Sequence, residues 1–142
     1  MIGSMKHVLA LGVALALATA AVACSDPVAP APATPVAATI SETFSGTLTI
    51  GGSNLHQFAV TQVGGLKVTL DNVTPSAAVL LSVGTPSTAT GACAPLSGLT
   101  TVAGPSVQIS GTATVTGNFC VSVADVGNLV ESVTYTISVL HS

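Results

Sequence analysis

Apolar and polar residues alternate at every second position through much of the chain after residue 39. The clearest run is residues 133–139, which reads Val-Thr-Tyr-Thr-Ile-Ser-Val. A β-strand places successive side chains on opposite faces, so this alternation predicts strands with one buried face. No stretch after residue 39 shows helical periodicity. The sequence therefore predicts an all-β domain.

Turn residues, including the pairs Gly51-Gly52 and Gly64-Gly65, separate these runs at short intervals. Residues 84–104 contain several prolines and glycines and little periodicity, so we expect an irregular loop there. Seven or eight short strands at this spacing predict a small antiparallel β-sandwich. The expected strands are residues 43–50 (with a candidate bulge at Gly46), 55–63, 66–71, 77–83, 107–109, 112–116, 119–123 and 133–139.

The first 23 residues have the pattern of an export signal. Residues 8–23 contain no charge and no proline, and this run is shorter than the roughly 20 residues of a membrane-spanning helix. It ends in Ala21-Val22-Ala23-Cys24, which resembles the bacterial lipoprotein signal, the lipobox. The resemblance implies cleavage before Cys24 and a membrane anchor through lipid on its thiol. Ala21 departs from that family's usual leucine, and Ala-Val-Ala also fits ordinary signal peptidase, which would release a secreted protein.

A proline-rich segment follows the cysteine. Pro27, Pro30, Pro32 and Pro35 disfavour helix and sheet, and the segment would reach roughly 45 Å as a polyproline-like stalk. We therefore expect a signal peptide over residues 1–23, a lipidated cysteine and linker over 24–39, and the β-sandwich over 40–142. Because Ser25 follows the cysteine, the lipoprotein resemblance implies the outer membrane or cell surface in a Gram-negative host.

The chain has three cysteines. With Cys24 assigned to lipid, Cys93 and Cys120 remain as a pair in an oxidising compartment, and we expect a disulfide between them. Two free thiols are the alternative. Cys120 alternates with Phe119, so we expect it to point away from the core. The bond would then hold the loop of residues 84–104 over the outer face of the strand, and would stabilise the fold by about 3 to 4 kcal/mol.

Three strand patterns resemble the bacterial pre-peptidase C-terminal domain, a small β-sandwich appended to secreted proteases and other exported proteins. They are residues 54–60 with Phe58 at the family's aromatic position, residues 117–123 with Phe119, and residues 135–139 beginning at Tyr135. The resemblance covers roughly residues 54–140 and implies a non-catalytic accessory fold. The family's middle strand is often led by aspartates, and residues 76–81 contain none, which argues against a calcium role.

Charged residues make up 5% of the chain, against about 25% in ordinary proteins, and Lys67 is the single cation after residue 23. This balance argues against nucleic acid binding. No Gly-x-Ser-x-Gly elbow or metal-ligand cluster occurs, so we expect no enzyme, no cofactor and no metal. A triad of His56 or His141 with Asp71 or Asp125 stays open as a hydrolase alternative. Otherwise we expect His56 to be a solvated strand residue and His141 to lie in a frayed terminus.

Asp125 and Glu131 flank one turn, where we expect them to serve solubility. Taken together, the sequence predicts a cell-envelope-anchored bacterial lipoprotein with a non-catalytic interaction or structural module. Its partners would be the membrane, through the lipid, and an unknown protein or glycan. The alternative is a polysaccharide-binding module that uses residues 84–104, although this segment has no aromatic side chain for stacking on a sugar.

Overall fold

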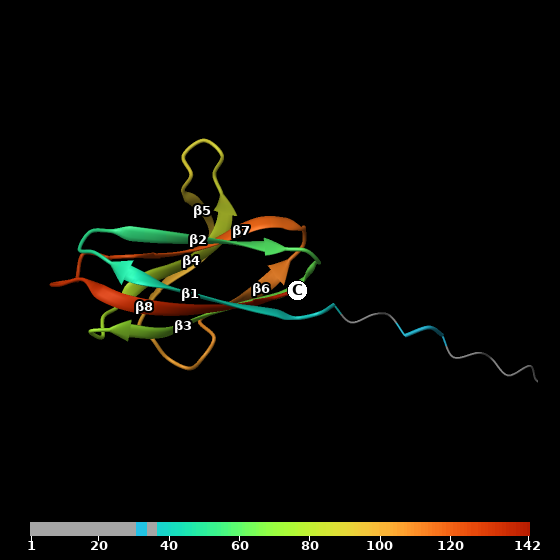
Figure 1. Ribbon diagram of the computed structural model, residues 1–142, viewed down its shortest axis with the longest axis horizontal. Coiled ribbons are helices and arrows are strands. Elements are labelled where there is room, and N and C mark those ends of the chain that lie inside the picture. The colour runs from blue at the N-terminus through green and yellow to red at the C-terminus, as the bar shows by residue number, and fades with distance from the viewer. Residues whose placement is uncertain (1–30, 34–36) are drawn as a thin grey trace, which may run out of the picture. The chain divides into compact units, whose positions relative to one another are not determined.

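The computed structural model describes residues 31–33 and 37–142, and within them the chain forms eight β-strands in two antiparallel sheets (Figure 1). The chain divides into Met1–Thr34 and Pro35–Ser142, and all of these strands lie in the second unit. The predicted all-β sandwich is confirmed. The strands are β1 (Ile40–Leu48), β2 (Ser53–Val60), β3 (Gly64–Thr74), β4 (Val79–Pro86), β5 (Cys93–Thr101), β6 (Ile109–Ala113), β7 (Gly117–Ala124) and β8 (Val133–His141).

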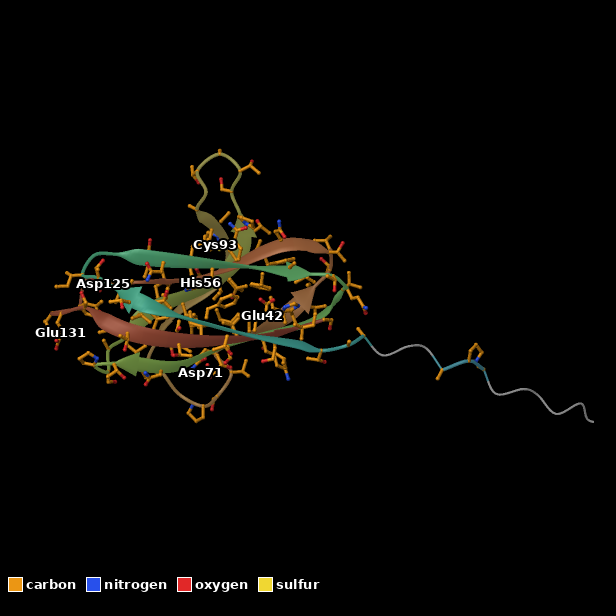
Figure 2. All side chains as sticks on the ribbon, viewed as in Figure 1. Glu42, His56, Asp71, Cys93, Asp125 and Glu131 are labelled. Atoms are coloured by element: carbon orange, nitrogen blue, oxygen red, sulfur yellow. A yellow bond between two sulfur atoms is a disulfide. The ribbon has the colours of Figure 1, made fainter. Side chains whose placement is uncertain are left out.

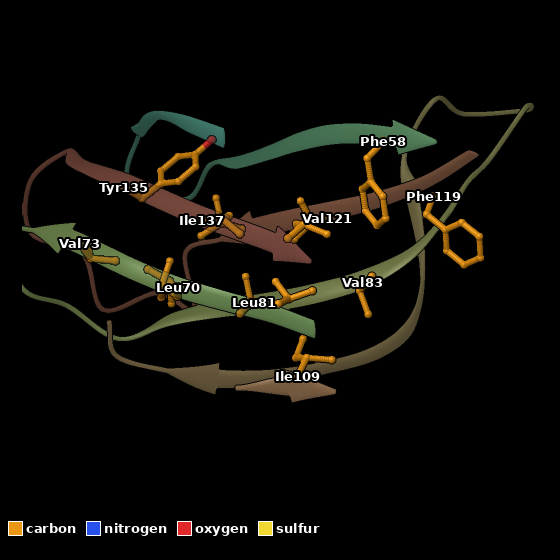
Figure 3. Packing of buried hydrophobic residues seen from close by; sticks show 14 of the residues in the cluster. Phe58, Leu70, Val73, Leu81, Val83, Ile109, Phe119, Val121, Tyr135 and Ile137 are labelled. Carbon is orange, nitrogen blue, oxygen red and sulfur yellow. The ribbon is translucent and has the colours of Figure 1, made fainter. Parts of the chain in front are cut away.

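The first sheet has the strand order β1-β8-β3-β6, and the second has the order β2-β7-β4-β5. In the inner strands, alternate residues point into the space between the sheets, as Ile137 and Leu70 do opposite Val121 and Leu81 (Figure 3). The predicted inward face of β7 is confirmed, because Phe119, Val121 and Val123 are buried in the same cluster as the inward residues of β8. The alternation of the sequence therefore translates directly into one apolar layer.

Residues 84–104 are not the irregular loop that the sequence predicted. Strand β4 continues to Pro86, and β5 pairs with it from Cys93 onward, so only residues 87–92 are left as the hairpin loop at the top of Figure 1. The prediction failed because β5 is an edge strand with most of its side chains exposed, so it has no alternation to detect. Pro95 and Gly98, which argued against a strand, are tolerated at an edge.

Two further expectations, on the strand at residues 107–116 and on Gly46, are also corrected. The two short strands expected at residues 107–109 and 112–116 are one strand, β6, in which Gly111 pairs with Leu66. Gly46 is not a bulge, because β1 and β8 keep an unbroken register from Ile40 to Leu48. Strand β6 pairs with only the first half of β3. Beyond it, the Gln108 side chain bonds to the backbone of β3. Its Oε1 accepts from the Leu70 N–H at 2.7 Å.

A disulfide joins Cys93 to Cys120 with a Cα–Cα distance of 5.8 Å, as predicted. Cys120 alternates with the inward residues of β7 and lies outside the apolar cluster, yet it is fully buried. The bond links β5 to β7 across the intervening strand β4. It holds the first residue of an edge strand, and not the irregular loop that the sequence predicted.

Gly84 belongs to β4 and lies where the disulfide crosses this strand. It pairs with Cys120 on one side and with Pro95 on the other, and Leu96 is the extra residue of a bulge between the two registers of β5. A Cβ atom at position 84 would overlap the carbonyl oxygen of Ala94. The missing side chain of Gly84 therefore allows the backbone of β5 to approach β4 closely beside the disulfide.

We expect Gly84→Ala to destabilise the domain by about 1 to 3 kcal/mol, because the backbone of Ala94 and Pro95 would have to move away from β4. Gly65→Ala is the matched control, since a Cβ at that strand position meets nothing within 4 Å. It should be neutral or stabilising by up to about 1 kcal/mol. Urea unfolding of both oxidised variants measures the difference. Equal stabilities would show that the close approach at Gly84 is unimportant.

Candidate functional site

A cluster of polar and aromatic side chains lies where β1 faces β2. These are edge strands of opposite sheets, and they contact each other directly. The Asn54 side chain also donates to the Thr47 carbonyl oxygen at 2.8 Å, which ties the two strands together. We call this cluster the β1–β2 seam, and Glu42 and His56 from its two strands are labelled in Figure 2. Its members are Glu42, Phe44, His56, Phe58, Tyr135 and His141.

His141 is the most deeply buried polar residue of the seam, with a side chain that is 0% exposed. The expectation of a frayed terminus is wrong, because His141 is the last residue of β8 and pairs with both Ile40 and Leu66. Its Nε2 lies 2.9 Å from Glu42 Oε1, and its Nδ1 lies 3.3 Å from the main-chain oxygen of Ser142. Its ring also lies against Phe58, with centroids 5.2 Å apart.

Both partners of His141 are acceptors. A neutral imidazole carries one N–H, whereas a carboxylate oxygen and a main-chain oxygen are both acceptors. With an N–H on Nε2, His141 donates to Glu42 Oε1, and this hydrogen bond to a carboxyl group joins β1 to β8.

His56 occupies the next part of the seam and is half-buried, which corrects the expectation of a solvated residue. Its Nε2 lies 2.8 Å from the Tyr135 hydroxyl, and its ring stacks on Phe44 with centroids 5.0 Å apart. Burial lowers the pKa of His56 and raises that of the Tyr135 phenol. Gly46 makes room for this contact, since a Cβ there would lie 2.7 Å from the Tyr135 hydroxyl oxygen.

The structure does not assemble the triad that the sequence left open. His56 is bonded to Tyr135 and His141 to Glu42, whereas Asp71 and Asp125 bond to other groups. Asp71 bulges from β3 and accepts the Ser138 hydroxyl at 2.6 Å on the outer face of the sheet. Within residues 31–33 and 37–142, no group of three His, Cys, Asp or Glu side chains is placed to hold a metal ion.

Asp125 organises the end of the sandwich where β1 turns into β2. Its Oδ2 accepts from the Gly51 N–H at 2.7 Å, and its Oδ1 accepts from the N–H groups of Gly127, Asn128 and Leu129. These bonds, that of Gly51 first, hold the pKa of the Asp125 carboxyl below its usual value of 3.8. The role expected for Asp125 was solubility, and the contacts show that it fixes two loops together. Glu131 is exposed on the same loop.

Two surface hollows are lined by residues outside the seam. One, of about 310 Å³, is lined by Ala37, Thr39, Gly65, Lys67, Leu140 and Ser142, and so includes the single cation of the described residues. A smaller one of about 120 Å³ opens between β5 and β6 over the apolar side chains of Leu96, Ile109 and Phe119. The segment predicted for glycan binding therefore contributes Leu96 and Ser97 to a mainly apolar hollow.

Cys24, the predicted site of lipidation, lies outside the described residues. The part of the chain that the structure describes contains no helix long and apolar enough to cross a membrane. In comparisons with known proteins, no family model and no curated protein matches this chain.

The sequence analysis missed the seam, although the signal was present. Glu42 shares its parity with Phe44 and Leu48, His56 with Phe58 and Val60, and His141 with Ile137 and Val139. In an alternating strand, equal parity means the same face. A polar residue in phase with the apolar ones should point inward, where it needs a partner, and this rule was not applied to Glu42, His56 and His141.

We expect Asp125→Asn to lower the melting temperature at pH 7, because an amide offers one acceptor oxygen where the carboxylate offers two. Since the folded pKa is depressed, the stabilisation by Asp125 is present above pH 3.8 and is lost as pH falls through the folded pKa. The variant should therefore lose less stability than the wild type in that acid range. Thermal melts between pH 2 and 7 test this expectation.

Asp71→Asn is the matched control, because it also removes one negative charge but affects only the contact with Ser138 on the outer face. It should resemble the wild type more closely than Asp125→Asn does. If both variants melted alike at every pH, the contacts of Asp125 would not be stabilising the fold.

Proposed function

We propose that this chain is a cell-envelope-anchored bacterial lipoprotein that presents a non-catalytic β-sandwich as an interaction or structural module. The resemblance of residues 21–24 to a lipobox supports the anchor, with Cys24 as the modified residue. The resemblance of three strands to the pre-peptidase C-terminal domain supports an accessory role. The Pro/Ala-rich linker would hold the domain away from the membrane.

The fixed pair of loops at one end of the domain is the observation that carries this proposal. Ile40 pairs with His141, so the chain enters the domain where β8 ends. The β1–β2 and β7–β8 connections lie at the opposite end and expose Ile50 (59%), Val126 (44%) and Val130 (89%), while other exposed apolar side chains, such as Leu96, lie elsewhere on the domain. Asp125 fixes these two loops to each other, so the exposed side chains are held in place before any partner binds. The end remote from the linker is therefore the surface that we assign to a partner.

The hydrogen-bond partners of the titratable groups support a non-catalytic role. The interior histidines are bonded to Tyr135 and Glu42, and the Asp125 carboxylate receives backbone N–H groups. Each of these contacts joins two strands or two loops. A catalytic base instead needs a reacting group within hydrogen-bonding reach and a cleft that admits substrate.

We expect the mature protein to begin at Cys24, to carry acyl chains on that residue and to partition with the membrane. Several acyl chains, at about 0.8 kcal/mol per buried methylene, are sufficient for stable attachment. Detergent phase separation, followed by mass spectrometry of the N-terminal peptide, measures both properties. The Cys24→Ser variant should lose the lipid and move to the aqueous phase. A wild-type protein that starts at Cys24 without modification would instead support ordinary secretion.

Polysaccharide binding remains the second candidate, and one surface of the domain favours it. The outer face of the β1–β8–β3 sheet presents a hydroxyl array on neighbouring strands, which suits an uncharged polyhydroxylated ligand. The array consists of Ser41, Thr43, Ser45 and Thr47 on β1, Thr134, Thr136 and Ser138 on β8, and Thr69 and Thr74 on β3.

The two candidates assign different surfaces, so labelling can separate them. We expect a photo-reactive residue in place of Val130 to give protein adducts in intact producing cells, and the same residue in place of Thr136 to give few. The polysaccharide candidate instead predicts retention on a glycan array that Thr136→Val weakens and Val130→Ser leaves unchanged. Adducts at Thr136 alone would contradict the assignment of the remote end.

A further inference from the structure

Two titratable side chains of the seam, His56 and Tyr135, have no charged partner and contact each other. The other titratable groups that face the seam are Glu42 from β1 and His141 from β8. In the described residues, β3 and β7 contribute only uncharged inward side chains there, such as Val68, Leu70 and Val121. Because Glu42 and His141 are paired with each other, the neighbours of the His56 ring are Phe44 and the Tyr135 phenol.

This arrangement disfavours a second proton on His56. The half-buried ring has lost part of its hydration, and neither the Tyr135 hydroxyl nor the Phe44 ring carries a negative charge that would compensate. Separation of β1 from β2 would return the ring to water. Protonation and opening of the seam are therefore coupled, and acid favours the open state.

We propose that the β1–β2 seam is an acid-sensitive latch, in which uptake of a proton by His56 releases β1 from the sandwich. Strand β1 is the element through which the chain enters the domain from the linker. Its release would uncover the backbone edge of β8 from Val133 to His141, which β1 covers along its whole length. It would also uncover Tyr135, against which Gly46 of β1 lies. The proposal adds a conformational response to the domain and does not depend on what the remote end binds.

The pKa direction agrees with this geometry. Burial lowers the pKa of His56, so the closed seam binds fewer protons than the open one. The stabilisation is complete above the ordinary histidine pKa of about 6.5 and is lost as pH falls toward the folded value. Asp125 is a carboxyl group, and acids of this type titrate mainly below pH 5 in water. A measurement between about pH 5 and 7.5 therefore reports on histidine, and substitution of His56 separates its contribution from that of any other group in the seam.

Hydrogen exchange of the oxidised, full-length protein tests the latch. After correction for intrinsic exchange rates, the opening constant of the β1 amides should rise by up to about tenfold per pH unit below pH 6.5, which is the limit for uptake of one proton. Amides of the central strands β4 and β7 should change much less over this range. His56→Gln, which keeps a polar partner for Tyr135 but does not titrate, should remove the contribution of His56 and so lower the pH dependence in β1.

Glu42→Gln is the matched control from the same seam. Its amide can still bond to His141, and it leaves His56 unchanged, so the pH dependence of β1 should persist. Equal pH dependence in the wild type and in His56→Gln would overturn the proposal. Should His56→Gln fail to fold, the ring protons of His56 in the wild type decide by nuclear magnetic resonance. Titration of these protons at the same pH in the folded protein and in urea would also overturn it.

Discussion

The structure depends on the burial of alternate side chains between two sheets that share one apolar layer. Each strand contributes only one face to this layer, so a slip of one residue would exchange its buried and exposed sets. Strand β8 shows the constraint most clearly, because its inward residues from Val133 to Val139 are almost fully buried while it pairs with β1 on one side and β3 on the other. With 5% charged residues, the chain has few other means of specifying which face lies inside.

The same constraint leaves each sheet with two edges, and the edges are protected in different ways. An unprotected edge strand can pair with another chain, and natural proteins prevent this with prolines, bulges, short strands or inward charges. Strand β5 has Pro95 and a bulge at Leu96, whereas β6 is short. Strands β1 and β2 are long, and they place Glu42 and His56 on their inward faces. The seam therefore limits edge pairing, and its polar groups are the ones to which we assign the proposed response to acid.

Most of the fold could be predicted because the inner strands alternate. Strands β3, β7 and β8 are buried on one face, and their parity fixed both their positions and their inward residues. Strand β5 could not be found in this way, because an edge strand with both faces largely exposed shows no alternation. The disulfide was predicted because two cysteines remained as a pair. Its position beside Gly84 depends on a bulge in β5, and no local sequence pattern predicts that bulge. Within the seam, parity places Glu42, His56 and His141 inside, but it cannot show that Glu42 meets His141 while His56 meets Tyr135. Those partners depend on how the two sheets stack.

The distribution of charge limits how this domain can recognise a partner. Glu42 and the histidines are bonded inside the seam, Asp71 accepts from Ser138, and Asp125 fixes two loops, so most of the ionisable groups act within the fold. Lys67 and Glu131 are exposed charges that remain for the surface. Charges give long-range steering and partner discrimination, and a domain with so few of them must discriminate by shape, by apolar contact and by hydroxyl groups. Such contacts are short-ranged and need a high local concentration of the partner. A membrane anchor and a linker that hold the domain beside its partner would provide that concentration, because tethering makes a weak interface effective.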